Sequence, residues 1–208
     1  MNIFSRLFGS SDEDKAKYTV RLVKDEVRES LKPLGDISLA IVKASYACAL
    51  QMNWILNIPD EKEKKEIEDL VFYEFVYFFI HLTMRSAFAQ LYEQQIKRLQ
   101  DYLVPLISST AVDSFFAQWP EDLKEKIKSE FYDKLNDAEL EYSTCKELFS
   151  EKNPMTGNSL FSKLARNIAE LSGNSMNPAV LTLVISSGVD AYKEMQLDLF
   201  VKKAGMIL

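Results

Sequence analysis

The fold is decided by residues 70–91, which read LVFYEFVYFFIHLTMRSAFAQL. Aromatic and aliphatic residues dominate this stretch, and its only acidic, basic or imidazole side chains belong to Glu74, His81 and Arg85. A helix that is apolar on most sides leaves water only if other elements surround it. These three residues interrupt the run of about 20 apolar residues that a membrane-spanning helix needs. The stretch therefore predicts a long, mostly buried central helix.

This stretch lies inside a longer helical segment, residues 61–107, which begins with a charged run. Its C-terminal part repeats apolar residues at intervals of 4, 3, 4 and 3: Tyr92, Ile96, Leu99, Leu103 and Leu106. One continuous helix would be about 70 Å long at ~1.5 Å per residue, which exceeds a single domain of this size. We therefore expect a break near residues 86–92, although no Pro or Gly marks it.

A first helix is predicted upstream, after a capping box formed by Ser10 and Glu13. Its apolar residues recur at intervals of 4, 3, 4 and 4: Ala16, Val20, Val23, Val27 and Leu31. Pro33 and Gly35 are expected to stop this helix, and Asp36 is expected to cap the next one, which ends near residue 57.

Downstream, the same spacing rules predict four more helices, over about 110–119, 121–150, 158–172 and 178–203. The chain has only six Gly and six Pro, and no alternating strand pattern of useful length appears. We predict an all-α fold, a compact bundle of six to seven helices. Residues 1–9 are expected to be flexible or docked, and residues 10–208 to form one domain. Residues 108–156, with 11 acidic against 6 basic residues, are an alternative second lobe.

Charge and composition exclude several classes of function. The 208 residues carry 25 basic and 31 acidic side chains without a basic stripe, which argues against nucleic acid and anionic lipid as partners. Cys48 and Cys145 are expected to be reduced and buried. No secretory signal is evident, so the chain is placed in the cytoplasm. One histidine and no Cys-x-x-Cys pair leave no metal or cofactor to predict.

The candidate site lies on the central helix. Glu74, His81 and Arg85 fall on one helical face, and Tyr77 lies beside them in an unusually aromatic run. One interpretation is a buried polar network, in which each group bonds a neighbouring helix because unpaired burial is costly. The other is a pocket for a small molecule, since ionisable groups in apolar surroundings mark functional sites.

Other surfaces are candidates for contact with partners. Phe115, Phe116 and Trp119 are predicted to form a lid, a partner-binding knob or simple packing. Residues 1–9 carry Ile3, Phe4, Leu7 and Phe8, which support at most weak peripheral membrane contact. An acidic stripe consists of Glu130, Asp133, Asp137 and Glu141, and it is interpreted as a solvated face or a weak site for a cation or a basic partner.

Two hypotheses of function follow. The preferred one is a non-enzymatic interaction or regulatory module, as a homo-oligomer or with an unknown protein partner, because no catalytic set of residues is evident. The alternative is a small-molecule-binding protein or a cryptic enzyme with a pocket around Glu74, Tyr77, His81 and Arg85.

Overall fold

The computed structural model describes residues 32–52, 58, 60–115, 120–150 and 157–208. Within these residues there are seven helices and no strand, which confirms the predicted all-α class. The helices are α4 (Lys32–Met52), α5 (Glu61–Gln90), α6 (Glu93–Phe115), α7 (Glu121–Tyr142), α8 (Leu160–Leu171), α9 (Pro178–Met195) and α10 (Leu197–Gly205). The first predicted helix and residues 1–9 lie outside the described residues.

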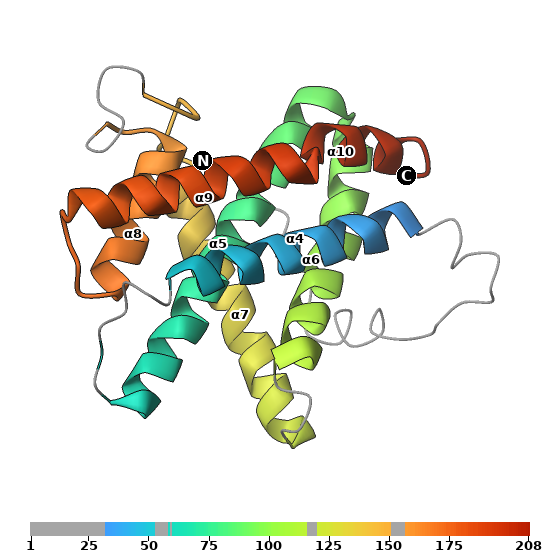
Figure 1. Ribbon diagram of the computed structural model, residues 1–208. Helices are drawn as coiled ribbons and strands as arrows, with labels where there is room; N and C mark the ends of the chain where they lie inside the picture. The colour runs from blue at the N-terminus through green and yellow to red at the C-terminus, as the bar shows by residue number, and fades with distance from the viewer. Residues whose placement is uncertain (1–31, 53–57, 59, 116–119, 151–156) are drawn as a thin grey trace.

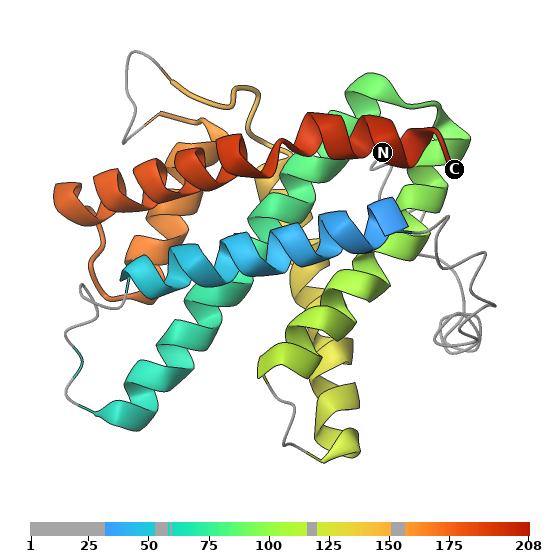
Figure 2. The same ribbon diagram turned by 45° about the vertical axis from the view of Figure 1, so that its right-hand side comes forward.

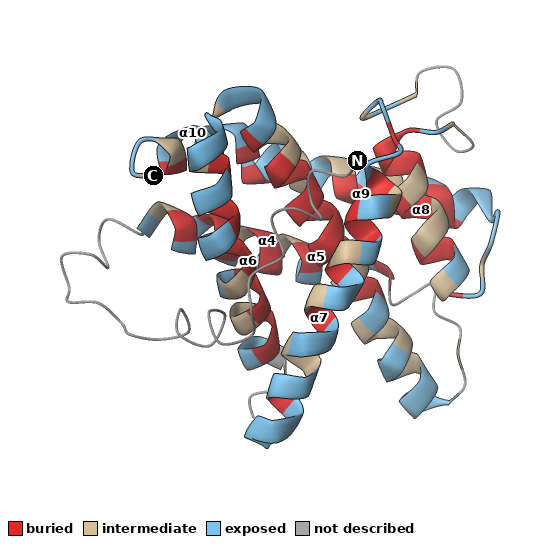
Figure 3. Ribbon diagram, turned by 180° about the vertical axis from the view of Figure 1, so that it is seen from behind, coloured by how far each residue is buried: buried red, intermediate tan, exposed pale blue. Residues whose placement is uncertain are grey.

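The helices cross in two layers (Figures 1 and 2). In these views α5, α6 and α7 run steeply, and α4 lies across them together with α9 and α10. Helix α4 packs against α5, α6, α9 and α10, while α7 packs against α5 and α6. Seen from behind, the buried residues gather on the inward sides of the helices, and much of α7 is exposed (Figure 3).

Helix α5 is the predicted central helix. Asp60 caps its first turn by accepting a hydrogen bond from the backbone N–H of Glu63 at 2.8 Å. The charged first turns are mostly exposed, and from Val71 onwards most side chains are buried. The core contains four fully buried phenylalanines of this helix: Phe72, Phe75, Phe78 and Phe79. The central position of the apolar stretch is therefore confirmed.

The predicted break in residues 61–107 is also confirmed. Helix α5 ends at Gln90, Leu91 is extended, and α6 begins at Glu93. The side chain of Gln95 reaches back and accepts a hydrogen bond from the Tyr92 backbone N–H at 3.1 Å. This is one half of a capping box, and it starts a new helix without Pro or Gly.

The predicted start of the second helix was wrong. Helix α4 begins at Lys32, so Pro33 and Gly35 lie in its first turn and Asp36 is not its cap. Proline is compatible with the first turn because the N–H that it lacks would have no intrahelical partner there.

The predicted short helix over 110–119 was also wrong, because α6 continues through Pro105 to Phe115. Instead of capping a helix, the Thr110 hydroxyl donates to the Leu106 carbonyl at 2.7 Å, one turn earlier in the same helix.

The C-terminal helices follow the predicted signals with one exception. Gly173 has a φ of 66° just after α8, and Asn177 caps α9 by accepting from the Ala179 N–H at 3.0 Å. The helix predicted to reach residue 203 is divided at Gln196, whose φ of 49° is left-handed. Helix α7 ends at Tyr142, earlier than the predicted residue 150.

Two findings bear on burial. Cys48 and Cys145 are free and buried, as predicted. Among the described helices, α4 alone has the length and apolar composition to cross a membrane, and 44% of that window is buried inside the molecule. A buried core helix meets the same criteria, so this finding does not indicate a membrane span.

Candidate functional site

The predicted site residues lie where α5 faces α7 and α8. Glu74, Tyr77, His81 and Arg85 follow one another at intervals of 3, 4 and 4, so they form one stripe along α5. The hydrogen-bonding partners of three of them come from α7, from α8 and from the turn after α7. The packing of these elements therefore decides what the stripe can do.

At the middle of the stripe, His81 pairs with Glu139 of α7. The distance from His81 Nδ1 to Glu139 Oε2 is 2.7 Å, and the two side chains are 9% and 3% exposed. An ionised carboxylate only accepts hydrogen bonds, so the imidazole carries a proton on Nδ1 and donates it. The His81 ring also lies beside the Tyr142 ring, with 5.6 Å between centroids. Both partners are thereby fixed in orientation.

The other two polar atoms of this pair have no hydrogen-bond partner. His81 Nε2 and Glu139 Oε1 are buried, and neither bonds to any described group. In a neutral imidazole with its proton on Nδ1, Nε2 is an acceptor, and so is Oε1 of the carboxylate. A buried polar atom without a partner costs roughly 1–3 kcal/mol. The pair therefore offers two buried acceptors whose cost a bound donor group would offset.

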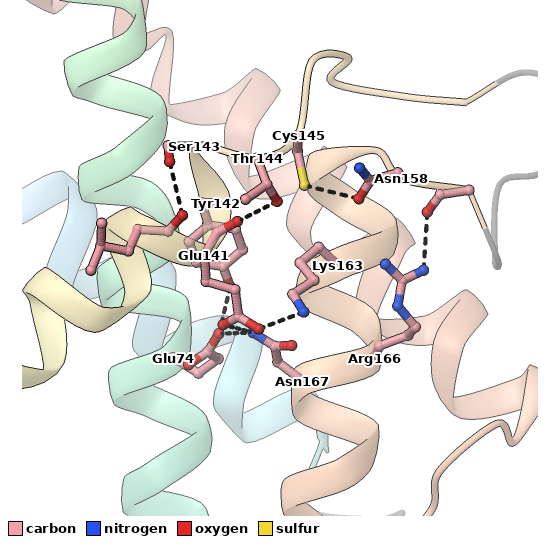
Figure 4. Close-up of polar contacts among 12 residues, drawn as sticks. Glu74, Glu141, Tyr142, Ser143, Thr144, Cys145, Asn158, Lys163, Arg166 and Asn167 are labelled. Carbon is pink, nitrogen blue, oxygen red and sulfur yellow. Dashed lines mark hydrogen bonds and ion pairs between the residues drawn. The ribbon is translucent and has the colours of Figure 1, made fainter. Parts of the chain in front are cut away.

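At one end of the stripe, Glu74 joins α5 to α7 and α8 (Figure 4). Its Oε1 accepts hydrogen bonds from the Tyr142 hydroxyl at 2.5 Å and from Asn167 Nδ2 at 2.8 Å. Burial raises the pKa of the Glu74 carboxyl, and these two hydrogen bonds offset part of the rise. Burial, together with the charge of Glu74, raises the pKa of the Tyr142 hydroxyl well above its ordinary range.

The same cluster includes Glu141, which lies beside Glu74 and above α8 in Figure 4. Its carboxylate accepts a hydrogen bond from Asn167 at 3.0 Å and forms an ion pair with Lys163 at 2.5 Å. The polar groups at this end of the stripe are thus held mainly by one another.

At the other end, Arg85 holds the turn that follows α7. Its guanidinium donates from Nη1 to the Cys145 carbonyl at 3.0 Å and from Nη2 to the Lys146 carbonyl at 2.5 Å. These carbonyls follow the last turn of α7, where a cation also interacts favourably with the helix dipole. Arg85 keeps its positive charge in this arrangement, because no carboxylate is bonded to it.

Tyr77 contributes mainly to packing. It is 8% exposed, and its ring lies 5.2 Å from that of Phe131 and 6.1 Å from that of Tyr73, centroid to centroid. Burial raises the pKa of its hydroxyl, so it remains protonated at any ordinary pH.

Two separate hollows lie along the seam between α5 and α7. Glu74 and Tyr77 line one of about 570 Å³, together with Lys134, Asp137 and Glu141. His81 and Arg85 line the other, of about 380 Å³, which we call the His81 pocket. Its remaining lining residues are Met84, Phe88, Glu139, Ser143, Cys145 and Lys146. The four predicted residues thus share one stripe but divide between two hollows. The polar network and a pocket coexist.

Other predicted sites are less informative. The side chains of Phe115, Phe116 and Trp119 lie outside the described residues. In the acidic stripe, Glu130 pairs with Lys126 at 3.8 Å and Glu141 with Lys163. In the part of the chain that the structure describes, no group of three or more His, Cys, Asp or Glu side chains is placed to hold a metal ion.

The sequence analysis missed the partners of the stripe. Glu139 follows Ala138 and precedes Tyr142 by three residues, and both of those positions were expected to face inwards, so this spacing was an available signal for a buried carboxylate. No such signal marks Asn167 or Lys146, because their roles depend on how α8 and the turn after α7 pack against α5.

No protein family, no curated protein and no solved structure matches this chain. The argument for function therefore depends on the geometry of the site alone.

Proposed function

We propose that this chain is a non-enzymatic protein that binds a small molecule in the His81 pocket. The observation that carries the proposal is the buried His81–Glu139 pair, whose Nε2 and Oε1 atoms lack partners in residues that line this pocket. Its volume of about 380 Å³ lies within the range of about 300–1,000 Å³ that is usual for small-molecule sites.

The charges around the pocket suggest the class of ligand. Two buried acceptors suit a group with several N–H donors, such as a primary ammonium. Arg85 and Lys146 line the same pocket and suit a carboxylate. Met84 and Phe88 supply an apolar wall, and Phe88 is 44% exposed. An α-amino acid with a short apolar side chain combines these three features.

Calorimetric titration with L-leucine tests this proposal. We expect saturable binding of L-leucine, and at least tenfold weaker binding of 4-methylpentanoate, which lacks the ammonium, and of 3-methylbutylamine, which lacks the carboxylate. Equal affinity for all three compounds, or no binding of L-leucine at millimolar concentration, would contradict the proposed ligand class.

A matched pair of lysine variants locates the site. Lys146 lines the His81 pocket and Lys134 lines the other hollow, and both are exposed. Lys146→Ala is expected to weaken L-leucine binding, while Lys134→Ala leaves it unchanged. The reverse pattern would move the site to the hollow beside Glu74.

The alternative class, a protein-interaction module, stays a prediction for residues 115–119. A different apolar surface, on α4, has its own evidence and is considered below.

A further inference from the structure

One face of α4 carries an apolar stripe that points away from the core. Leu39, Tyr46 and Leu50 are 44%, 45% and 49% exposed, whereas Ile37 and Ile41 on the opposite side are fully buried. Leu39 and Leu50 are eleven residues apart, which is three helical turns, so they lie on the same face. In Figures 1 and 2 this helix lies on the outside of the molecule, across α5 and α6.

The face is poor in charge. Lys43 is the exposed charged residue between Leu39 and Leu50, and Ala47 is also exposed there. A row of large apolar side chains on a helix is usually covered by another element, because exposed apolar surface is unfavourable in water. The question is which element covers it.

The chain supplies a matching element directly before α4. The capping box at Ser10 and Glu13 and the stripe that follows it predict an amphipathic helix that ends near Leu31. Such a helix is marginal alone and gains most of its stability by packing its apolar side against a surface. Its stripe is narrow and consists of Ala16, Val20, Val23, Val27 and Leu31.

Length and attachment favour pairing within one chain. Residues 10–31 would form a helix of about 33 Å, and α4, with 21 residues, is about 31 Å long at 1.5 Å per residue. Leu31 is bonded to Lys32, the first residue of α4. A segment attached at this point has an effective concentration near the millimolar range at the α4 surface, which a second molecule does not reach.

We propose that residues 10–31 fold back along α4 as an antiparallel helix and cover the stripe formed by Leu39 and Leu50. The turn between the two helices takes its few residues from the end of the predicted helix. This inference is independent of the His81 pocket, which lies between α5 and α7.

Hydrogen exchange measured by mass spectrometry on the full chain tests the proposal. Backbone amides of residues 16–28 are expected to be protected at least tenfold relative to an unstructured peptide. The double variant Leu39→Asp, Leu50→Asp is expected to remove this protection while the protection of α5 and α8 persists. The matched control is Leu123→Asp, because Leu123 is 41% exposed on α7, which packs against α5 and α6. It should leave residues 16–28 protected.

A second variant keeps the test decisive if the double variant unfolds. Val23→Asp changes the covering segment and leaves the α4 side chains intact, and it should likewise abolish protection of residues 16–28. Unprotected amides in the parent chain would overturn the proposal, as would protection that neither change removes. Protection that disappears on dilution together with a dimer would assign the α4 face to a second copy, and cosedimentation with vesicles through Leu39 would assign it to a membrane. Either result would also refute the proposal.

Discussion

At the scale of single residues, the His81–Glu139 pair combines good geometry with incomplete satisfaction. One hydrogen bond of 2.7 Å joins the two side chains, and each retains one buried atom without a partner. Removing one member of a buried pair leaves the other uncompensated, which costs more than the pair itself contributes. Stability and binding therefore depend on different atoms of the same two residues.

Glu139→Ala is expected to lower the free energy of unfolding by about 3 kcal/mol, because it leaves the His81 Nδ1–H buried and unpaired. Glu139→Gln keeps an acceptor and should cost less. Urea denaturation measures both. The control is Glu130→Ala, whose side chain is 63% exposed and which should stay within about 0.5 kcal/mol of the parent. Equal effects at the two positions would contradict the buried pairing.

Glu74 should make stability fall as the pH rises. Burial raises the pKa of its carboxyl in the folded state above the ordinary value of 4.5, so the folded protein binds this proton more tightly than the unfolded chain. The cost of ionising Glu74 is absent below pH 4.5, grows as the pH rises through the folded pKa, and is complete above it.

Glu74→Gln removes this cost and keeps an oxygen that accepts from Tyr142. The free energy of unfolding of the variant relative to the parent should therefore increase between pH 4.5 and neutral pH, as followed by urea denaturation at several pH values. A difference that stays constant, or decreases, over this interval would show that the charge of Glu74 is not penalised by burial.

At the scale of elements, local signals located helix ends well where the signal is short-range. The caps at Asp60 and Asn177 and the glycine after α8 were all legible in the sequence. The errors have one cause: Pro33 and Pro105 were weighed as breakers, but packing keeps both inside helices. The break at Gln196 carries no sequence signal, because a left-handed glutamine is imposed by the packing of α9 and α10.

Two glycines with open space around them should respond oppositely to alanine. An added Cβ meets nothing within 4 Å at either Gly35 or Gly173, but Gly173 has a φ of 66° while Gly35 lies inside α4. Gly35→Ala is expected to stabilise the fold by about 0.5–1 kcal/mol, because it removes backbone entropy from the unfolded chain.

Gly173→Ala is expected to destabilise the fold by about 1–2 kcal/mol, because L-residues are strained in the left-handed region. Thermal unfolding of the two variants beside the parent measures the difference. The same sign for both substitutions would mean that local conformation does not control stability at these helix ends.

At the scale of the whole molecule, the fold class and the central helix were predictable, because apolar periodicity is a local property and α5 is apolar around most of its circumference. The site was predictable only in part. Its α5 residues stand out as polar groups in an apolar stretch, but their partners are 58 to 93 residues away in sequence. Such pairings depend on how helices cross, which no local pattern specifies.

The central claim is that the His81–Glu139 pair lines a pocket that binds a ligand, and nuclear magnetic resonance of the imidazole tests it most directly. The chain has one histidine, so 15N-labelled histidine gives a single set of ring signals. We predict a proton on Nδ1 in the free protein and a saturable shift of the Nε2 signal on addition of L-leucine, weakened in Lys146→Ala. An Nε2 signal that does not respond while L-leucine binds, or a proton on Nε2 alone in the free protein, would contradict the account.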